Sequence, residues 1–420
     1  MIFMQKNRLL LIAYYWPPSG GSGVQRWINL SNHLIDLGWE IFVITAKNPN
    51  YDPVDHSLLK KINTKISVLK VPIFEPAKFF KSDIKNRKKG SSFLKKILIW
   101  IRANLFFPDA RMFWINKTSE FAIEVIRKNK IDAVITTGPP FSSHLIGLKI
   151  KSSIDVKWIS DFRDPWVNFF QFNLMPINFY LKHKHRKYEN ECLKLSDCIL
   201  TTTPSLTEHY KKTNVNTYTI TNGFNSFSKN NLNKKFILTY SGIMKSIQNP
   251  KNLWKVLNEI CSVNQDFKND FLLKIIGDID YEIISNEDLN KMKDNVRFED
   301  YMEKTKLDIE LSKACVFILS SINMEGSKFI IPGKLYYYFS FRRPIISFCS
   351  THDDTADIIN KTQSGKVFDY VETEKLKKYI LELYSSFKIN KNNFRPVELK
   401  KYNFKSISQR LDTILKKNIN

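Results

Sequence analysis

The sequence lacks the long apolar run that a membrane-spanning helix requires. Such a helix takes about 20 consecutive apolar residues, and no stretch of this 420-residue chain approaches that length. The apolar run Leu9–Ala13 is short and is followed closely by a glycine-rich loop, so we expect a first β-strand there and not a signal peptide. We therefore expect no transmembrane helix.

Cysteines and histidines are also scarce. The five cysteines are scattered without a Cys-x-x-Cys pair, which is typical of a reducing compartment and excludes a zinc knuckle. Among the seven histidines only His183 and His185 lie close together, and no other ligand type adjoins them. We expect a cytoplasmic protein without a bound metal.

Acidic residues are few relative to basic ones. The chain carries 65 Lys and Arg against 41 Asp and Glu, a net charge of +24. An excess of this size indicates an anionic partner such as nucleic acid, a membrane surface or a phosphorylated substrate, unless it reflects only a Lys- and Asn-rich genome. The basic residues are spread out and form no nucleic-acid recognition module, so we expect no nucleic-acid partner.

What the sequence does contain is a regular alternation of strand and helix patterns. The strand expected at Arg8–Tyr14, the amphipathic helix after it and the strand at Ile41–Ile44 form a βαβ unit, which predicts a parallel sheet. A polar stretch at Asn222–Lys235 interrupts the alternation, which resumes at Phe236. The length fits two domains, so we predict an α/β protein of two doubly wound domains.

One basic segment, residues 78–114, departs from this alternation. Seven lysines accompany apolar residues at helical spacing, from Phe93 to Ile101. This pattern favours an amphipathic helix lying on an anionic membrane surface, with the lysine-rich run Lys85–Lys89 beside it. The alternative is a core helix with a solvated basic face.

A glycine-rich loop, Pro17–Arg26, joins the first strand to the first helix. Glycines allow a backbone to approach a ligand closely, so Gly20, Gly21 and Gly23 predict a ligand-facing loop, although a bare turn is the alternative. Arg26 stands where a dinucleotide-binding motif has its third glycine. We therefore expect neither NAD nor FAD, nor a nucleotide-binding P-loop.

Two polar clusters follow predicted strands, where ligands of parallel sheets bind. His144 comes shortly after the strand ending near Thr136, and Asp161, Arg163 and Asp164 follow another. Carboxylates, a guanidinium and an imidazole suit the hydroxyls of a sugar. The alternatives are a local cap for His144 and a purely structural Arg–Asp pair for the second cluster.

In the second half, Gly333 and Lys334 open a predicted helix and place a cation where a pyrophosphate could bind. Asp278-Ile279-Asp280 has the form of a metal-binding Asp-x-Asp motif but follows a strand late in the chain. We interpret it as a strand-end turn. Serine-hydrolase and zinc-protease motifs are missing, so a hydrolase has no support.

Taken together, these motifs resemble those of glycosyltransferase family 4 (group 1). The chain is most similar to the branch of bacterial surface-polysaccharide loci that opens with a Tyr-Tyr-Trp-Pro-Pro-Ser-Gly-Gly-Ser-Gly stretch, here starting at Tyr14. The resemblance extends over nearly the whole chain. Its other matching segments are Phe107–Arg111, Thr137–Pro140, Asp161–Trp166, Thr221–Phe224 and Gly333–Tyr336.

This resemblance implies the GT-B fold, in which two doubly wound Rossmann-like domains face a cleft. Residues 1–225 would form the acceptor-side domain, with the basic amphipathic insertion near 78–114. Residues 226–393 would form the domain that binds the nucleotide-sugar, and residues 394–420 a C-terminal helix that crosses back to the first domain.

The resemblance also implies a metal-independent, retaining reaction whose nucleotide-sugar is a co-substrate, without a further cofactor. It places Asp161 near the reacting sugar, and His144 and Arg163 from the two polar clusters complete the predicted catalytic residues. The residues that it places against the donor are Gly20, Gly21, Gly23, Gly242, Lys245, Gly333, Lys334 and Tyr337.

Tyr337 departs from the family pattern, because relatives carry a glutamate there that binds the donor ribose. Loss of a charge-assisted hydrogen bond of this kind costs about 1.5–3 kcal/mol. Met244-Lys245-Ser246 likewise offers one lysine where relatives have an Arg and Lys pair. Altered donor use is therefore one expectation.

Two functions follow. The first is a retaining glycosyltransferase, peripheral at the inner face of the cell membrane. It would move a sugar from a nucleotide-sugar to a polyprenyl-phosphate-linked or glycan acceptor, for lipopolysaccharide, O-antigen or capsule. The second is a non-catalytic GT-B-fold subunit of a polysaccharide-assembly complex.

Overall fold

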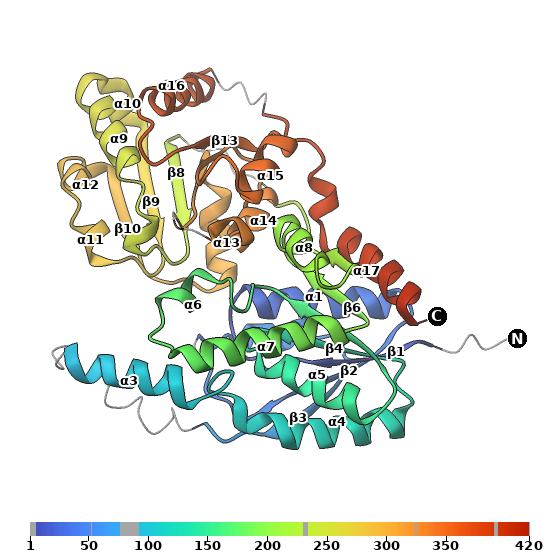
Figure 1. The fold of residues 1–420 in the computed structure, drawn as a ribbon. Helices are drawn as coiled ribbons and strands as arrows, with labels where there is room; N and C mark the ends of the chain where they lie inside the picture. Colours follow the sequence, from blue (N-terminus) through green and yellow to red (C-terminus); the bar gives the residue numbers. More distant parts are fainter. Residues whose placement is uncertain are drawn as a thin grey trace, which may run out of the picture. The chain divides into compact units, whose positions relative to one another are not determined.

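The computed structural model describes residues 6–51, 53–75, 92–229, 234–322, 324, 326–389 and 394–419. They form two compact units: unit 1 comprises Met1–Asn222 with Phe404–Asn420, and unit 2 comprises Gly223–Asn403 (Figure 1). The expected boundaries were residues 225 and 393, so the stretch 394–403 belongs to unit 2 and not to the C-terminal segment.

Unit 1 is built on a seven-stranded parallel sheet of order β3-β2-β1-β4-β5-β6-β7. β1 is central and pairs with both β2 and β4, for example Leu9 with Ile41 on one side and Ala133 on the other. The strands are β1 (Arg8–Ile12), β2 (Glu40–Lys47), β3 (Ser67–Pro72), β4 (Ala133–Gly138), β5 (Lys157–Phe162), β6 (Cys198–Thr201) and β7 (Thr217–Thr219).

Helices cover both faces of this sheet. Successive residues of β1 point to opposite faces, and because both sets are apolar, both faces have to be buried. Leu9 and Leu11 join one buried cluster, and Leu10 and Ile12 join another. The helices are α1 (Ser22–Asp36), α3 (Ser92–Leu105), α4 (Ile115–Asn129), α5 (Ser142–Ser153), α6 (Phe170–Leu174), α7 (Phe179–Leu195), α8 (Pro204–Lys211) and α17 (Phe404–Ile419), with short 3-10 turns at His56–Lys61 and Met112–Trp114.

The C-terminal helix α17 packs inside unit 1. Its residues Ile407, Leu411 and Leu415 are buried in the same cluster as Leu9, and Asp412 accepts a hydrogen bond of 2.7 Å from the indole of Trp39. Along the sequence, the chain therefore returns to unit 1 after it has passed through unit 2.

Unit 2 contains a six-stranded parallel sheet of order β10-β9-β8-β11-β12-β13. Its strands are β8 (Phe236–Ser241), β9 (Phe271–Ile276), β10 (Val296–Glu299), β11 (Val316–Ser320), β12 (Ile345–Phe348) and β13 (Gly365–Phe368). Its helices are α9 (Lys251–Val263), α10 (Gln265–Asp270), α11 (Tyr281–Ile284), α12 (Glu287–Lys291), α13 (Lys304–Ser312), α14 (Gly333–Phe339), α15 (Asp354–Thr362) and α16 (Glu374–Lys388), with 3-10 turns at Ser246–Gln248, Lys293–Asn295, Ser327–Phe329 and Leu399–Tyr402.

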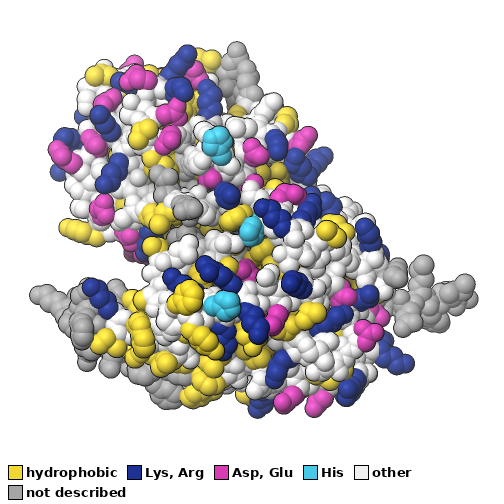
Figure 2. All heavy atoms as spheres, in the orientation of Figure 1, with side chains coloured by type: hydrophobic (Ala, Val, Ile, Leu, Met, Phe, Trp, Pro, Cys, Tyr) yellow, Lys and Arg dark blue, Asp and Glu magenta, His cyan; other side chains and the backbone are white. Residues whose placement is uncertain are grey.

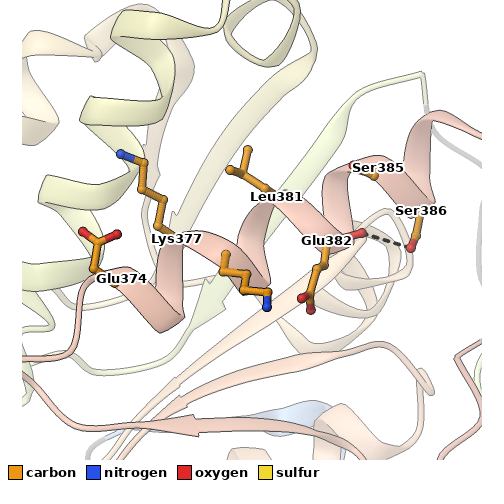
Figure 3. A pocket seen from close by; sticks show the side chains of 7 residues that line it. Glu374, Lys377, Leu381, Glu382, Ser385 and Ser386 are labelled. Atoms are coloured by element: carbon orange, nitrogen blue, oxygen red, sulfur yellow. Dashed lines mark hydrogen bonds between the residues drawn. The ribbon is translucent and has the colours of Figure 1, made fainter.

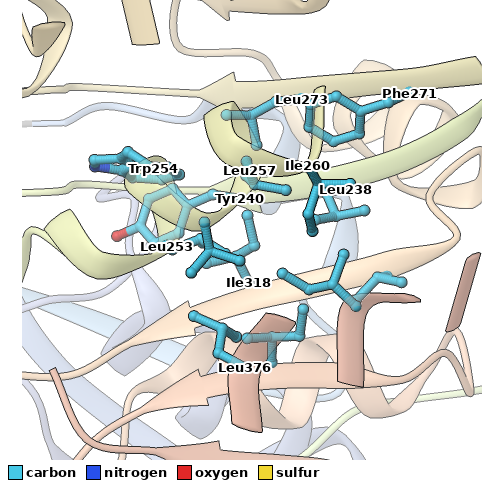
Figure 4. Packing of buried hydrophobic residues seen from close by; sticks show 14 of the residues in the cluster. Leu238, Tyr240, Leu253, Trp254, Leu257, Ile260, Phe271, Leu273, Ile318 and Leu376 are labelled. Carbon is cyan, nitrogen blue, oxygen red and sulfur yellow. The ribbon is translucent and has the colours of Figure 1, made fainter. Parts of the chain in front are cut away.

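The main core of unit 2 lies between the sheet and helices α9 and α16. Leu253, Trp254 and Leu257 project from α9 onto Leu238 of β8, and Leu376 closes the cluster from α16 (Figure 4). The apolar positions of α9 recur at helical spacing, which is why one face is buried while Lys255 and Glu259 on the other face remain at least partly exposed.

Both sheets are doubly wound, so the predicted α/β fold class is confirmed. The direction in which strands are added reverses between β1 and β4 in unit 1 and between β8 and β11 in unit 2. Ligands of such sheets bind beyond the carboxyl ends of the strands at these reversal points. Each unit therefore has one edge where a ligand is expected.

The basic segment expected near 78–114 is described only in part. Its second half forms helix α3, whereas Lys85–Lys89 lie outside the described residues. Across the described ranges, each helix is too short or too polar to cross a bilayer.

Candidate functional site

The glycine-rich loop of unit 1 lies where β1 gives way to α1. Gly21 has φ +101°, a conformation that side-chain-bearing residues rarely adopt. The amide of Gly20 donates a hydrogen bond of 2.9 Å to the carbonyl of Pro53, and Ser19 forms a bridge with Val54. The loop is thus held against the segment that follows β2. Contact of Gly20, Gly21 and Gly23 with donor phosphates stays a prediction.

Gly23 has a role inside the protein. A Cβ atom at this position would lie 1.5 Å from Nη1 of Arg163, so only glycine leaves room for that guanidinium against the first turn of α1. The main-chain N and Nε of Arg163 both donate to the carbonyl of Gly138, at 3.0 and 3.3 Å, and Nη2 donates to the carbonyl of Pro139. Arg163 therefore braces the loops after β1 and β4 against each other.

Asp161 lies at the end of β5 and is inaccessible to solvent. Its carboxylate accepts hydrogen bonds from Nη2 of Arg26 at 3.0 Å, from the indole of Trp27 at 2.8 Å and from the hydroxyl of Thr137 at 2.7 Å. Burial acts to raise the pKa of Asp161, but the charge of Arg26 and the three donors outweigh it and hold the pKa below its usual range. The carboxylate is ionised and committed to protein donors.

Sequence analysis did not identify Arg26 and Trp27 as the partners of Asp161. Arg26 is fully buried, and its Nη1 also donates to the carbonyl of Thr221 at 2.7 Å. Arg26, which stands where a dinucleotide-binding motif has its third glycine, is therefore a buried cation. The sequence does show an arginine directly before a tryptophan at the start of a helix. It does not show their partner, because 135 residues separate Arg26 from Asp161.

His144 lies in the first turn of α5 and is completely buried. Its Nδ1 is 2.9 Å from the hydroxyl oxygen of Thr136, which already accepts a hydrogen bond from the indole of Trp158. This arrangement favours donation from Thr136 to Nδ1 and so places the ring hydrogen on Nε2. Nε2 has no hydrogen-bond partner within the described ranges. Burial lowers the pKa of His144 to about 3, so the ring is neutral.

In unit 2, Gly242 and Lys334 meet at the reversal point between β8 and β11. Gly242 has φ +115° and follows β8, and a Cβ at this position would lie 3.1 Å from Nζ of Lys334. Nζ donates a hydrogen bond of 2.5 Å to the hydroxyl of Tyr240 and lies 3.9 Å from the centre of its ring. Burial lowers the pKa of Lys334 to about 7. Gly333, at the start of α14, adjoins this ammonium group.

Lys245 has two carboxylate partners. Its Nζ is 3.0 Å from Asp278 and 3.1 Å from Asp280, and the hydrogen bonds to them raise the pKa of Lys245. The Asp-x-Asp turn after β9 thus faces a lysine, and the described residues contain no cluster of ligands suited to a metal ion. Lys245 is half exposed, so its two surface ion pairs leave it accessible.

Tyr337 in α14 donates its hydroxyl hydrogen bond to Asp308 of α13. Burial, and then this bond to a carboxylate, raise the pKa of Tyr337. Lys304 lies 3.9 Å from the centre of the tyrosine ring and 2.9 Å from the same carboxylate. The position at which the family resemblance predicts a glutamate therefore adjoins a carboxylate from another helix, which sequence analysis did not identify.

The predicted site residues form two groups, one in each unit. At the carboxyl edge of the unit 1 sheet lie Gly20, Gly21, Gly23, His144, Asp161 and Arg163. At the corresponding edge of unit 2 lie Gly242, Lys245, Gly333, Lys334 and Tyr337. A surface hollow along α16, lined by Glu374, Lys377 and Glu382 among others, contains none of them (Figure 3).

Comparison with known proteins gives a family match within unit 2. Residues 235–386, most of unit 2, match the family model described as Glycosyl transferases group 1. No curated protein matches the sequence.

Solved structures resemble both units together. The crystal structure of TarM is 14% identical, covers 98% of this chain and 99% of its own, and has a TM-score of 0.62. WaaG, a glycosyltransferase involved in lipopolysaccharide biosynthesis, is 11% identical with 97% and 99% coverage and a TM-score of 0.56. A mutant of S. aureus TarM, in complex with fondaparinux, alpha-GlcNAc-glycerol and UDP, is 13% identical with 97% and 99% coverage and a TM-score of 0.60. At these identities the likeness establishes the fold, which is GT-B.

Proposed function

We propose, from the match of residues 235–386 to the family model described as Glycosyl transferases group 1, that the protein is a retaining, metal-independent glycosyltransferase. It moves a sugar from a nucleotide-sugar to a polyprenyl-phosphate-linked or glycan acceptor in the synthesis of a cell-surface glycan such as lipopolysaccharide, O-antigen or capsule. It acts in the cytoplasm at the inner face of the membrane.

The observation that carries the proposal is the meeting of Lys334 and Gly242 at the strand reversal of unit 2. The ammonium of Lys334 is desolvated and has one hydrogen-bond acceptor, the hydroxyl of Tyr240, among the described residues. Gly242 leaves the space beside that ammonium free of a side chain. A pyrophosphate would provide the negative partner that this cation lacks. The cation would in turn stabilise the pyrophosphate most when it departs as the leaving group of sugar transfer.

The carboxylates of unit 2 support a reaction without a metal. Asp278 and Asp280, the pair most similar to a metal-binding motif, both form an ion pair with Lys245. A cation from the protein then takes the place that a divalent metal would have at the departing phosphates.

Unit 1 offers groups for the sugars. The Nε2–H of His144 is a neutral donor without an acceptor in the described structure. Because the ring is completely buried, a hydroxyl of the donor or acceptor sugar would reach it only after the loop that follows β4 moves aside. Asp161 is a positioning residue, because its carboxylate is buried and holds Arg26, Trp27 and Thr137 in place. Arg163 sets the distance between the two loops that border this edge.

The non-catalytic alternative rests on Tyr337, which replaces the glutamate of relatives. Asp308 weakens that alternative, since it places a carboxylate in hydrogen-bond contact with the same tyrosine. A ribose in this region would still find an acidic partner.

Calorimetry with UDP-, GDP- and TDP-sugars, with and without magnesium, tests the proposal. We expect one nucleotide class to bind equally well in both conditions, and Lys334→Met to weaken its binding at least about tenfold. Lys291→Met is the matched control, because that lysine lies on α12 outside the predicted donor residues and pairs with Glu287, and we expect a change within about threefold. Failure of every donor to bind would favour the non-catalytic subunit.

A further inference from the structure

Helix α3 exposes apolar residues on more than one of its faces. Four consecutive side chains, Ile97 to Trp100, are 37–50% exposed, and Leu105 is 63% exposed. Four consecutive positions extend around a full helical turn, so α3 does not simply turn one apolar face to the core as α4 does. Figure 1 shows α3 at the edge of unit 1, extending beyond its sheet.

A second apolar segment, which we call the elbow, comprises residues 174–180 and runs from the last residue of α6 to the first two residues of α7. Four of its side chains are strongly exposed: Leu174 (64%), Met175 (43%), Phe179 (84%) and Tyr180 (74%). Sequence analysis assigned no role to it, because a short apolar stretch between two helices has the same composition whether it is buried or exposed.

Hydrogen bonds join α3 to the elbow. The side-chain amide of Asn104 donates to the carbonyl of Pro176 at 2.8 Å, and its oxygen accepts from the amide of Asn178 at 2.9 Å. Just after α3, the ring of Phe107 packs against His185 and Tyr188 of α7, with centroid distances of 4.8 and 5.2 Å. The two apolar segments therefore form one surface with a defined geometry.

This surface is basic as well as apolar. Residues 96–108 and 172–188 contain no Asp or Glu, and their basic residues are Lys96, Arg102, Lys182, Lys184, Arg186 and Lys187. In the space-filling view, apolar and basic side chains lie side by side over this part of unit 1 (Figure 2). Exposed indole, phenol and phenyl rings among lysines and arginines match the boundary between headgroups and acyl chains of an anionic bilayer.

We propose that α3 and the elbow together form one docking surface for an anionic lipid bilayer. The inference rests on the membrane location in the proposed function and identifies the residues responsible. Trp100 and Leu105 of α3 enter the interface together with Phe179 of the elbow, while the lysines and arginines contact lipid phosphates. Asn104 holds the two segments in register, so that neither acts as an independent anchor.

Flotation of the full-length protein with lipid vesicles tests this surface. One set contains phosphatidylcholine with about a third phosphatidylglycerol, and the other contains phosphatidylcholine alone. We expect binding to the first set only. The double variant Leu174→Ser/Phe179→Ser and the α3 variant Trp100→Ser should each lower the partition constant at least about tenfold.

The control is Val215→Ser, which changes a side chain of unit 1 that is 87% exposed but lies outside both segments, and it should bind as the wild type does.

Wild-type binding by the elbow variant would show that the elbow is not part of the surface. Equal binding to both vesicle sets would overturn the role of charge. Self-association without vesicle binding would make this surface an interface between copies. Because flotation needs no nucleotide-sugar, donor binding by the same sample separates failure of this inference from failure of the proposed function.

Discussion

Arg26 and Asp161 form an ion pair of 3.0 Å in which both side chains are inaccessible to solvent. The pair connects the first turns of α1 to the carboxyl end of β5, and Arg26 also holds the carbonyl of Thr221. The geometry of the ligand-facing edge in unit 1 therefore depends on one buried pair, and this dependence leads to the first prediction.

Removal of the cation from this pair should destabilise unit 1 strongly. Arg26→Met leaves the carboxylate of Asp161 buried with two neutral donors, and breaking a buried pair in this way costs about 3–5 kcal/mol. The free energy of unfolding, measured with urea, should fall by that amount. Lys211→Met, which removes an exposed pair with Glu208, should change it by less than about 1 kcal/mol. Equal effects of the two variants would contradict the structural role of Arg26.

Nucleotide binding should weaken as the pH rises above 7. Lys334 has a pKa of about 7 in the free protein, and an adjacent pyrophosphate raises it, so binding takes up a proton. Affinity should then fall by up to about tenfold per pH unit while the bound form stays protonated. Calorimetry at pH 7, 8 and 9, in buffers of different ionisation enthalpy, measures both the affinity and the proton uptake.

The control for this effect is Lys334→Arg, since arginine stays protonated and should abolish the pH dependence. The same pKa shift affects stability in a defined direction. The pKa of Lys334 in the folded protein lies below the value of about 10.4 for an unfolded lysine. The contribution of Lys334 to the free energy of unfolding should therefore be largest above pH 10, decrease as the pH falls from 10 to 7, and stay constant below pH 7. An affinity that is flat between pH 7 and 9 would refute the assignment of Lys334 to the phosphates.

Asp308 should matter more for donor binding than the hydroxyl of Tyr337. If the carboxylate binds the ribose, Asp308→Asn weakens donor binding about ten- to a hundredfold. Tyr337→Phe leaves the carboxylate beside Lys304 and should change affinity within about threefold. Tyr337→Glu places a second carboxylate next to Asp308 and should bring no gain, because like charges in contact disfavour ionisation of both.

Donor titrations of these three variants decide between two explanations of position 337. A large gain from Tyr337→Glu, together with no effect of Asp308→Asn, would mean that Asp308 has not replaced the missing glutamate. That result would restore the reading of Tyr337 as a lost donor contact.

The sequence by itself determined the fold class and the location of the candidate loops. Apolar runs such as the one after Arg8, separated by amphipathic helices, predict parallel strands, because strand and helix periodicities depend on neighbours within a few residues. The same local pattern placed Gly333 and Lys334 at the entry to a helix. Resemblance to a family then indicated a glycosyltransferase, in agreement with the family match over residues 235–386.

Only the tertiary structure decided which side chains are partners. Arg26 meets Asp161 and Asp308 meets Tyr337 because sheet register and helix packing bring distant residues together. Gly23 is required by the guanidinium of Arg163, a reason that no local motif contains. The exposure of Phe179 depends in the same way on what packs against the elbow. Local spacing specifies secondary structure, whereas burial and pairing arise from contacts between segments far apart in the chain.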